Sequence, residues 1–412
     1  MSKFITIFPF IHINTKNNNT LFYNTLSGNG IVFRENAPIS LLAKKLEENN
    51  FACTIEEDQI SILDQNNFFN VLLENNIGYS IDVEKLQSLP FTTQCIDFRD
   101  NQLEKNIKKH EYLLENIREI TFYLNNFTSA TSHSKRSKLL HHQFIFPICE
   151  EEAKEINLIK VKSILKEVEG NPIIVNIVGG NILESFNYQD IVNELNNNSH
   201  NVFYYFHYSD LMNSDNINLL SGISEKAIKV ILVDFPFEQS EFMKWNEMIK
   251  RDGVKVEFIV ENEEQITEAE QIISKYEIVN YMFRPFYNGE NIDFFKENVF
   301  VNEEDALAVK ESLFDLATKK ISNPSFFGKL IFNADGNIYT SFNFPPIGNI
   351  NNVNIKNMIF NLLEDENSVW RVNKTVVEPC KNCIYNLLCP PISNYEYFIK
   401  KFDLCNLNNF EN

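Results

Sequence analysis

The chain has 412 residues, of which 44% are hydrophobic, and its 37 basic and 56 acidic residues give a formal charge of −19. This composition excludes an intrinsically disordered chain, and at about 150 residues per domain the length excludes a single small module. Nucleic acid is excluded as the principal partner, because its binding depends on Lys and Arg that neutralise phosphates. No apolar run approaches the roughly 20 residues that cross a bilayer, and no signal-peptide cleavage site follows the first apolar segment, so we expect a cytoplasmic protein.

Residues 1–100 are predicted to form a small α+β domain. Strands are expected at 4–13, 20–25 and 31–34, with Asn29-Gly30 in the turn of a hairpin. Helices are expected at 38–48, which opens with a proline, and at 68–74, where apolar residues recur at helical spacing. The polar stretch 97–106 is a predicted linker.

Residues 101–324 alternate between apolar strands and amphipathic helices. Such β/α units, with about 25–30 residues each, are typical of a parallel sheet that is either flat or curled into a partial barrel. Strands are predicted at 119–125, 172–178, 201–208, 227–233, 254–261 and 278–283, and helices at 153–168, 189–196, 240–250 and 263–275.

Residues 325–412 are predicted to form a third unit. It begins with a hairpin at 329–339, in which Asp335-Gly336 supplies the turn, and continues with a short helix at 353–363. The closing segment is rich in cysteine.

Four of the seven cysteines are crowded into this segment, as Cys380-x2-Cys383-x5-Cys389 followed by Cys405. In a reducing cytosol this crowding indicates metal binding rather than disulfides. Four thiolates complete either a tetrahedral zinc site or a four-iron cluster. Four buried free thiols are the alternative without a metal.

The third unit resembles the SPASM domain, which holds auxiliary iron–sulfur clusters in many radical SAM peptide-modifying enzymes. The hairpin, the stretch Ile347-Gly348-Asn349-Ile350 and the closing cysteines carry this resemblance. Two positions that hold cysteine ligands of the first auxiliary cluster in that family are Ser341 and Ser393 here. The resemblance therefore implies that the first cluster is absent, and that Cys380, Cys383, Cys389 and Cys405 bind one 4Fe–4S cluster, with zinc as the alternative.

The same resemblance implies that residues 101–324 form a partial (β/α)6 barrel of the radical SAM type. In that family a CxxxCxxC loop after the first strand binds the catalytic cluster, but residues 126–138 contain no cysteine and the nearest thiol is the single Cys149. Val178-Gly179-Gly180-Asn181 stands where the family has Gly-Gly-Glu, so Asn181 replaces the acid that receives the SAM amino group. The chain thus resembles the pseudo-radical-SAM/SPASM proteins of Bacteroidota-style double-glycine peptide systems, and we expect no SAM cleavage.

The N-terminal domain resembles a RiPP recognition element, a winged-helix-like α+β module that captures a leader peptide as an added strand. Strand addition uses the unpaired backbone of a sheet edge, with side pockets that select alternate residues. We expect precursor peptide at Ile31, Val32, Phe33, Phe69 and Leu72. The alternative is a plain α+β domain that packs on the barrel.

These features predict a partner in ribosomally synthesised peptide (RiPP) maturation that does not cleave SAM. Its expected partners are a precursor peptide and, as a second candidate, an intact radical SAM maturase. The alternative is an enzyme that modifies a peptide through its remaining cluster or its barrel cavity. The basic run 133–138 is a solvated loop or a contact for an acidic leader, and His133, His141 and His142 lack the spacing of a metal-ligand set. No nucleophile elbow, P-loop or HExxH motif supports hydrolase or nucleotide chemistry.

Overall fold

The structure is a computed structural model that describes residues 2–86, 110–127, 137–148, 150, 152–211, 218–237 and 253–407. Its N-terminal unit contains two antiparallel three-stranded sheets, in the orders β5-β1-β6 and β2-β3-β4. The single strand expected at 4–13 is wrong, because the chain turns at 8–10 and the two halves join different sheets. The strands are β1 (Lys3–Ile7), β2 (Ile11–Lys16), β3 (Asn19–Asn24), β4 (Asn29–Phe33), β5 (Ala52–Ile55) and β6 (Gly78–Asp82).

Three helices complete this unit and confirm the two that the sequence predicts. α1 begins after Asn36, whose side-chain oxygen accepts a hydrogen bond from the N–H of Ile39 at 3.2 Å. The apolar face of α1 and the rings of Phe22 and Phe68 form one buried core. The helices are α1 (Ala37–Glu48), α2 (Glu57–Gln65) and α3 (Phe68–Glu74).

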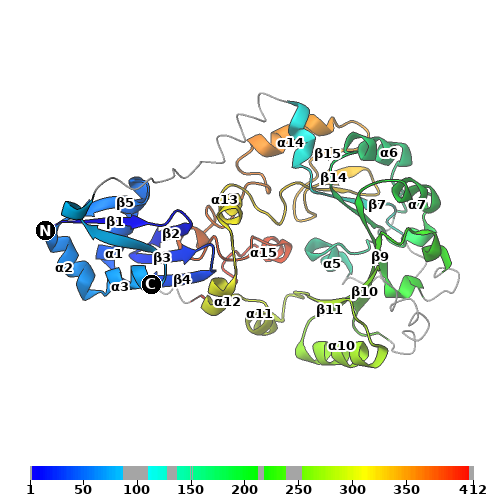
Figure 1. Ribbon diagram of the computed structural model, residues 1–412. Coiled ribbons are helices and arrows are strands. Elements are labelled where there is room, and N and C mark those ends of the chain that lie inside the picture. Colours follow the sequence, from blue (N-terminus) through cyan, green and yellow to red (C-terminus); the bar gives the residue numbers. More distant parts are fainter. Residues whose placement is uncertain are drawn as a thin grey trace.

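A nine-stranded sheet, in the order β12-β11-β10-β9-β8-β7-β13-β14-β15, forms the centre of the molecule. The six strands predicted in the middle of the chain are all present and pair in parallel, in chain order. The sheet curves around α5 (Figure 1). Its strands are β7 (Glu119–Tyr123), β8 (Ile174–Val178), β9 (Asn201–His207), β10 (Ile228–Asp234), β11 (Val254–Val260), β12 (Tyr281–Pro285), β13 (Lys329–Phe332), β14 (Asn337–Tyr339) and β15 (Gly348–Asn349).

The two faces of this sheet carry different neighbours. Residues such as Ile120, Phe122 and Val175 pack against the buried faces of α6 (Leu158–Glu167), α7 (Tyr188–Asn196) and α10 (Glu263–Tyr276). We call this side the helix face. The next residues along each strand point to the other side, because side chains alternate along a strand. That side, called the cavity face below, meets α5 and the C-terminal segment.

The hairpin of the C-terminal segment extends the same sheet. β13 pairs in parallel with β7, with Lys329 opposite Glu119, and β14 and β15 follow in antiparallel order. The predicted helix at 353–363 is α14. The remaining helices are α5 (Ser137–Gln143), α11 (Ile292–Asn298), α12 (Glu303–Ala308), α13 (Leu313–Ile321), α14 (Ile355–Glu364) and α15 (Asn394–Ile399), and the 3-10 turns are η1 (Val83–Lys85), η2 (His110–Asn116), η3 (Ile182–Glu184), η4 (Tyr208–Leu211), η5 (Leu220–Gly222) and η6 (Cys380–Asn382).

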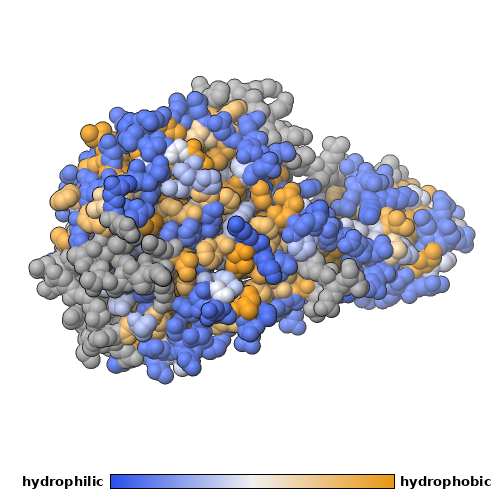
Figure 2. All heavy atoms as spheres, turned by 180° about the vertical axis from the view of Figure 1, so that it is seen from behind, coloured by the Kyte–Doolittle hydropathy of each residue, from blue (hydrophilic) through white to orange (hydrophobic). Residues whose placement is uncertain are grey.

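The N-terminal unit packs on the cysteine-rich segment through the outer face of β3. Leu21 and Tyr23 share a buried cluster with Tyr385 and Leu388, and the Tyr23 hydroxyl accepts a hydrogen bond from the N–H of Glu311 at 2.8 Å. Seen from behind, this unit is a mainly hydrophilic projection beside the larger body (Figure 2). Among the described residues, no helix is long and apolar enough to cross a membrane. The predicted linker at 97–106 and helix at 240–250 lie outside the described residues.

Candidate functional site

The four C-terminal cysteines line one cavity of about 160 Å³. Cys380 begins η6, Cys383 follows it directly, and Cys389 closes the next turn. Cys405 arrives from the chain end and is held by a bridge to Val301. The structure thus brings together the four residues that the sequence pattern selects.

The surroundings of these thiols are mostly apolar. Burial raises the pKa of Cys380 and of Cys389 to about 12, although the positive charge of Lys374 lowers both. The Cys380 thiol donates a hydrogen bond to the Phe402 carbonyl at 2.9 Å, and the Tyr385 N–H donates one to Cys383 Sγ at 3.4 Å. Since thiolates are the ligands, metal binding here releases protons.

The four cysteines can be compared with the ligand sets of known metal centres. Within the described ranges, no three His, Cys, Asp or Glu side chains approach closely enough to bind a single metal ion. Four thiolates suit either one zinc ion or a 4Fe–4S cluster, and these four cysteines line a cavity of about 160 Å³.

The side chains of Ser341 and Ser393 lie close together and are engaged in hydrogen bonds. Ser341 Oγ donates to Asn394 Oδ1 at 2.7 Å. The neighbouring Ser393 caps α15, where its Oγ donates to Glu396 Oε2 at 2.8 Å. Asn343 Nδ2 donates to the Asn394 carbonyl at 3.1 Å. An amide and hydroxyl network therefore occupies these positions.

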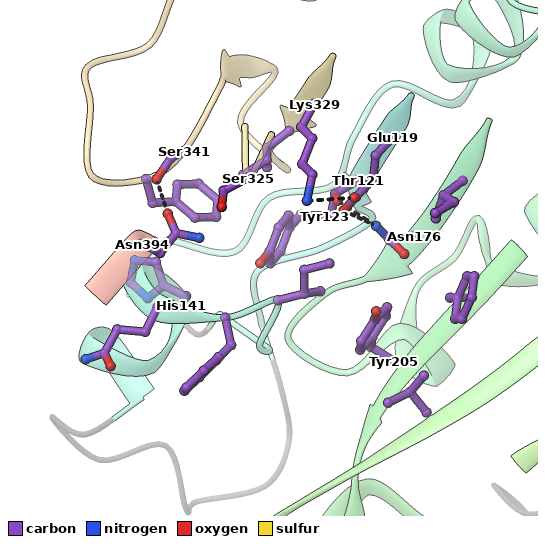
Figure 3. Close-up of a pocket in the computed structure, with 18 of the residues that line it drawn as sticks. Glu119, Thr121, Tyr123, His141, Asn176, Tyr205, Ser325, Lys329, Ser341 and Asn394 are labelled. Carbon is purple, nitrogen blue, oxygen red and sulfur yellow. Dashed lines mark hydrogen bonds and ion pairs between the residues drawn. The ribbon is translucent and has the colours of Figure 1, made fainter. Parts of the chain in front are cut away.

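A second, larger cavity of about 350 Å³ lies on the cavity face of the nine-stranded sheet (Figure 3). Alternate residues of seven strands line it, which follows from the period of two along a strand. The wall opposite β7 comes from α5 and from the Ser341–Asn394 contact. The lining residues from the strands are Glu119, Thr121, Tyr123, Ile174, Asn176, Phe203, Tyr205, Val230, Lys255, Glu257, Arg284, Lys329 and Ile331.

Two clusters of charged side chains line this cavity, one around Glu257 and one around Glu119. Glu257 accepts hydrogen bonds from Lys255 Nζ at 2.7 Å and from Arg284 Nε at 2.9 Å. Burial alone raises the pKa of Glu257, but Arg284 and Lys255 outweigh it and lower the pKa overall. On β7, Glu119 lies 3.1 Å from Lys329 Nζ and 2.8 Å from Asn176 Nδ2.

Apolar side chains fill the cavity face nearer the carboxyl ends of the strands. Tyr123, Val178, Leu232 and Ile259 form a buried cluster there with residues of the segment 139–148. Phe146 from that segment is 1% exposed, and its ring centroid lies 5.7 Å from that of His207. Among the described residues, the chain's own side chains therefore fill the cavity face at this end of the sheet.

The last residues of β9 and β10, His207 and Asp234, contact each other through their side chains. His207 Nε2 lies 2.8 Å from Asp234 Oδ1, and His207 Nδ1 lies 2.6 Å from Ser209 Oγ. Both ring nitrogens are therefore engaged within the protein. The contacts join the carboxyl ends of two adjacent strands.

The Gly-Gly-Asn turn after β8 packs directly on the chain that leaves β7. A Cβ on Gly180 would clash with the Phe127 backbone, so this position requires glycine. Asn181 is 2% exposed; its Oδ1 accepts from the N–H of Leu183 at 3.0 Å and its Nδ2 donates to Glu184 Oε1 at 3.1 Å. The Asn181 side chain therefore caps η3.

The predicted peptide-binding side chains are at least partly packed inside the protein. Ile31 and Phe33 contact the N-terminal core, where Phe33 lies 5.7 Å from the Phe68 ring, and Val32 packs on the cluster around Cys383. Phe69 and Leu72 are buried in the same core. β4 is an edge strand, because it is the last strand of the sheet β2-β3-β4.

Several residues singled out in the sequence have other positions. His141 lines the sheet cavity, and its ring centroid lies 4.3 Å from that of His142. His133, Cys149 and residues 128–136 lie outside the described residues. The sequence analysis did not identify the charged groups of the cavity. One pattern in the sequence does indicate them. In Val254-Lys-Val-Glu-Phe258, two charged residues alternate with apolar residues within a predicted central strand.

Neither a protein-family profile nor a curated protein sequence matches the chain. Streptococcus suis SuiB bound to precursor peptide SuiA superimposes with a TM-score of 0.50 at 12% identity, over 98% of this chain and 100% of that chain. SuiB bound to S-adenosylmethionine gives 0.46 at 13%, over 99% and 100%, and SuiB alone gives 0.48 at 12%, over 98% and 100%. The chain therefore shares with the peptide-bound structure a mixed α/β fold built on a large, mainly parallel sheet.

Proposed function

We propose that the protein binds a precursor peptide in ribosomal peptide maturation and does not itself cleave SAM. The observation that carries the proposal is the fold correspondence, over nearly the whole of both chains, with a structure that holds a precursor peptide. The N-terminal unit supports it, because it combines a hairpin-rich sheet with β4 as an edge strand. Added strands gain affinity from main-chain hydrogen bonds at such an edge.

The features around the carboxyl ends of the strands support the second half of the proposal. The sequence from 126 to 138 offers no thiolate for a catalytic cluster. Asn181 is held in hydrogen bonds within the chain, and Phe146 and its neighbours fill the space in front of β9 and β10. Anaerobic incubation with dithionite and SAM is expected to give no 5′-deoxyadenosine above a no-protein control, and its appearance would refute this half.

Peptide binding is tested on the full-length protein with a candidate precursor peptide, chosen from any short double-glycine peptides that the neighbouring genes encode. Calorimetry measures the affinity, which we expect to be weak to moderate because a disordered leader must be ordered on docking. Hydrogen exchange then locates the contact, and β4 should gain protection while β12, the edge of the large sheet, should not. Absence of binding defeats the proposal, whereas binding without protection of β4 moves the recognition site away from the N-terminal unit.

Cys380, Cys383, Cys389 and Cys405 are the proposed ligands of one 4Fe–4S cluster in a SPASM-like C-terminal segment. When bound, the cluster cross-links the chain end to η6 and to the loop after it, which stabilises a segment with a small core of its own. Metal analysis of anaerobically purified protein should give close to four irons per chain. One zinc would change the identity of the group, and no metal would exclude it.

An intact radical SAM maturase is the proposed second partner. Such an enzyme would supply the SAM chemistry that this chain lacks. Co-purification of a tagged full-length protein with a candidate radical SAM maturase, with and without the peptide, tests this association.

A further inference from the structure

The cavity on the large sheet lies at the end opposite to the filled one. Glu119 and Lys329 are the first residues of their strands, and Lys255 is the second residue of β11. Ile174, the first residue of β8, lines the cavity and is 37% exposed. The cavity therefore communicates with solvent at the amino ends of the parallel strands.

Positive charge exceeds negative charge among the lining residues. The cations are Lys255, Arg284 and Lys329, and the carboxylates are Glu119 and Glu257, so three positive and two negative groups leave one positive charge. This excess stands within a chain whose formal charge is −19. A negatively charged ligand that enters this solvent-accessible cavity would balance the excess.

Hydrogen-bond donors also outnumber acceptors there. Arg284 gives Nε and Nη2 to Glu257, at 2.9 and 3.1 Å, out of the five N–H groups of a guanidinium. Lys329 contacts Glu119 at 3.1 Å, and an ammonium has three N–H groups. Both carboxylates already accept from more than one donor. A ligand that accepts hydrogen bonds and carries negative charge completes this arrangement.

The remaining walls indicate the size and kind of that ligand. Ile174, Phe203 and Val230 present apolar surface beside the charged groups, whereas Thr121 and Tyr205 present hydroxyls. Figure 3 shows Tyr123 between the Glu119–Lys329 pair and His141, with Tyr205 to one side, below Asn176. At about 350 Å³ the cavity lies near the lower end of the range of about 300–1,000 Å³ for ligand pockets. It suits one or two residues of a chain.

We infer that this cavity binds a carboxylate of a peptide, with Lys329 and Arg284 as its donors and the apolar wall against its aliphatic stem. A single carboxylate balances the one excess charge, whereas a doubly charged phosphate would add repulsion from Glu119 and Glu257. The inference rests on the proposed function, since it names the part of a peptide that this cavity would take. An acidic side chain and a chain terminus share this chemistry.

Three small probes and the full-length protein test the assignment by ligand-observed NMR. N-acetyl-glutamate amide carries a side-chain carboxylate, N-acetyl-alanine carries a terminal one, and N-acetyl-glutamine amide is neutral. We expect at least one acidic probe to bind ten times more tightly than the neutral probe. The acidic probe that binds better identifies the source of the carboxylate. Equal binding of all three probes, or binding of none, overturns the inference. Inorganic phosphate is the fourth ligand tested, and if it binds more tightly than either acidic probe, the ligand is a phosphate and the inference is overturned.

Lys329→Gln and Arg284→Gln locate the binding, and Lys226→Gln, at an exposed lysine outside the cavity, is the matched control. Each cavity variant should weaken the acidic probe at least fivefold, and the control should not change it. Lys329→Gln is decisive if Arg284→Gln unfolds the protein. Unchanged binding in Lys329→Gln overturns the inference. If the precursor peptide fails to bind while an acidic probe binds, the proposed function falls and the cavity assignment stands.

Discussion

The two ends of the cavity face of the large sheet differ in almost every physical respect. At the carboxyl ends of the strands, Tyr123, Val178 and Leu232 pack with Phe146 into a closed apolar layer. At the amino ends, Glu119, Lys255 and Lys329 stand around a space that water reaches. Sheets of parallel strands usually bind their ligands at the carboxyl ends. This chain keeps the architecture, but its own side chains occupy that end.

The C-terminal segment shows the same division on a smaller scale. Cys380, Cys383, Cys389 and Cys405 line one cavity, while Ser341 and Ser393 are joined to Asn394 and Glu396 by hydrogen bonds. Contacts within the chain therefore engage the two serines, whereas the four cysteines lie around an open space.

Cys389→Ser is expected to have the largest effect. It removes one of four thiolates, and because metal affinity is coupled to folding the variant should lose several kcal/mol of stability together with its iron. Iron content and chemical denaturation of anaerobically prepared protein measure both. Cys53→Ala is the control, since Cys53 is a buried thiol in the N-terminal unit, and it should cost about 1 kcal/mol at most with unchanged iron. Equal losses in both variants would contradict a metal role.

Phe146→Ala tests the filled end. Removal of a ring that is 1% exposed should destabilise the protein by about 3–5 kcal/mol. Phe186, which is 91% exposed, provides the control, and Phe186→Ala should change stability by less than about 0.5 kcal/mol. Chemical denaturation compares the two. A loss below about 1 kcal/mol in Phe146→Ala would mean that the carboxyl end is loosely packed and accessible.

Sequence reasoning succeeded where local pattern decides the structure. The six parallel strands appear as runs of apolar residues, and the C-x2-C-x5-C spacing selects residues that the fold does bring together. It failed where the answer depends on distant segments. Nothing in the local sequence of 4–13 states that its halves join different sheets, or that Val32 packs on the cysteine-rich segment.

The cavity charges form a third case, between these two. Lys255 and Glu257 are two positions apart in β11, so their side chains lie on the same face of the sheet. Arg284, the partner of Glu257, and the Glu119–Lys329 pair come from other strands, whose order is known only from the fold. The sequence therefore contains each charge but not the pairing that creates an excess of one.

Glu257→Gln addresses the open end and should cost about 2–3 kcal/mol near neutral pH, because Lys255 and Arg284 then lack their carboxylate but keep partial access to water. The pKa of Glu257 is lowered from the ordinary value of 4.5 in the folded protein. The stabilisation is therefore full above pH 4.5 and is lost as pH falls through the lower folded value. Denaturation of both proteins across acidic pH should show the difference shrinking below pH 4.5. A constant difference would assign the effect to packing.

Asn181→Asp should have the smallest effect and is the most direct attempt to undo the filling of the carboxyl end. The substitution restores the acid that Gly-Gly-Glu supplies in the family that the chain resembles. In this chain it places a carboxylate about where Asn181 Nδ2 now donates to Glu184 Oε1 at 3.1 Å, so two acids face each other and stability should fall by about 1 kcal/mol. Its Oδ1 still caps η3, so the new charge points into the protein and not toward a ligand. We therefore expect calorimetry to detect no SAM binding by the variant or by the parent chain. Asn181→Ala loses the cap without adding charge, so it separates the two causes of destabilisation. If Asn181→Asp alone gains SAM binding, one missing carboxylate, rather than the filling of the carboxyl end, prevents the parent chain from binding SAM.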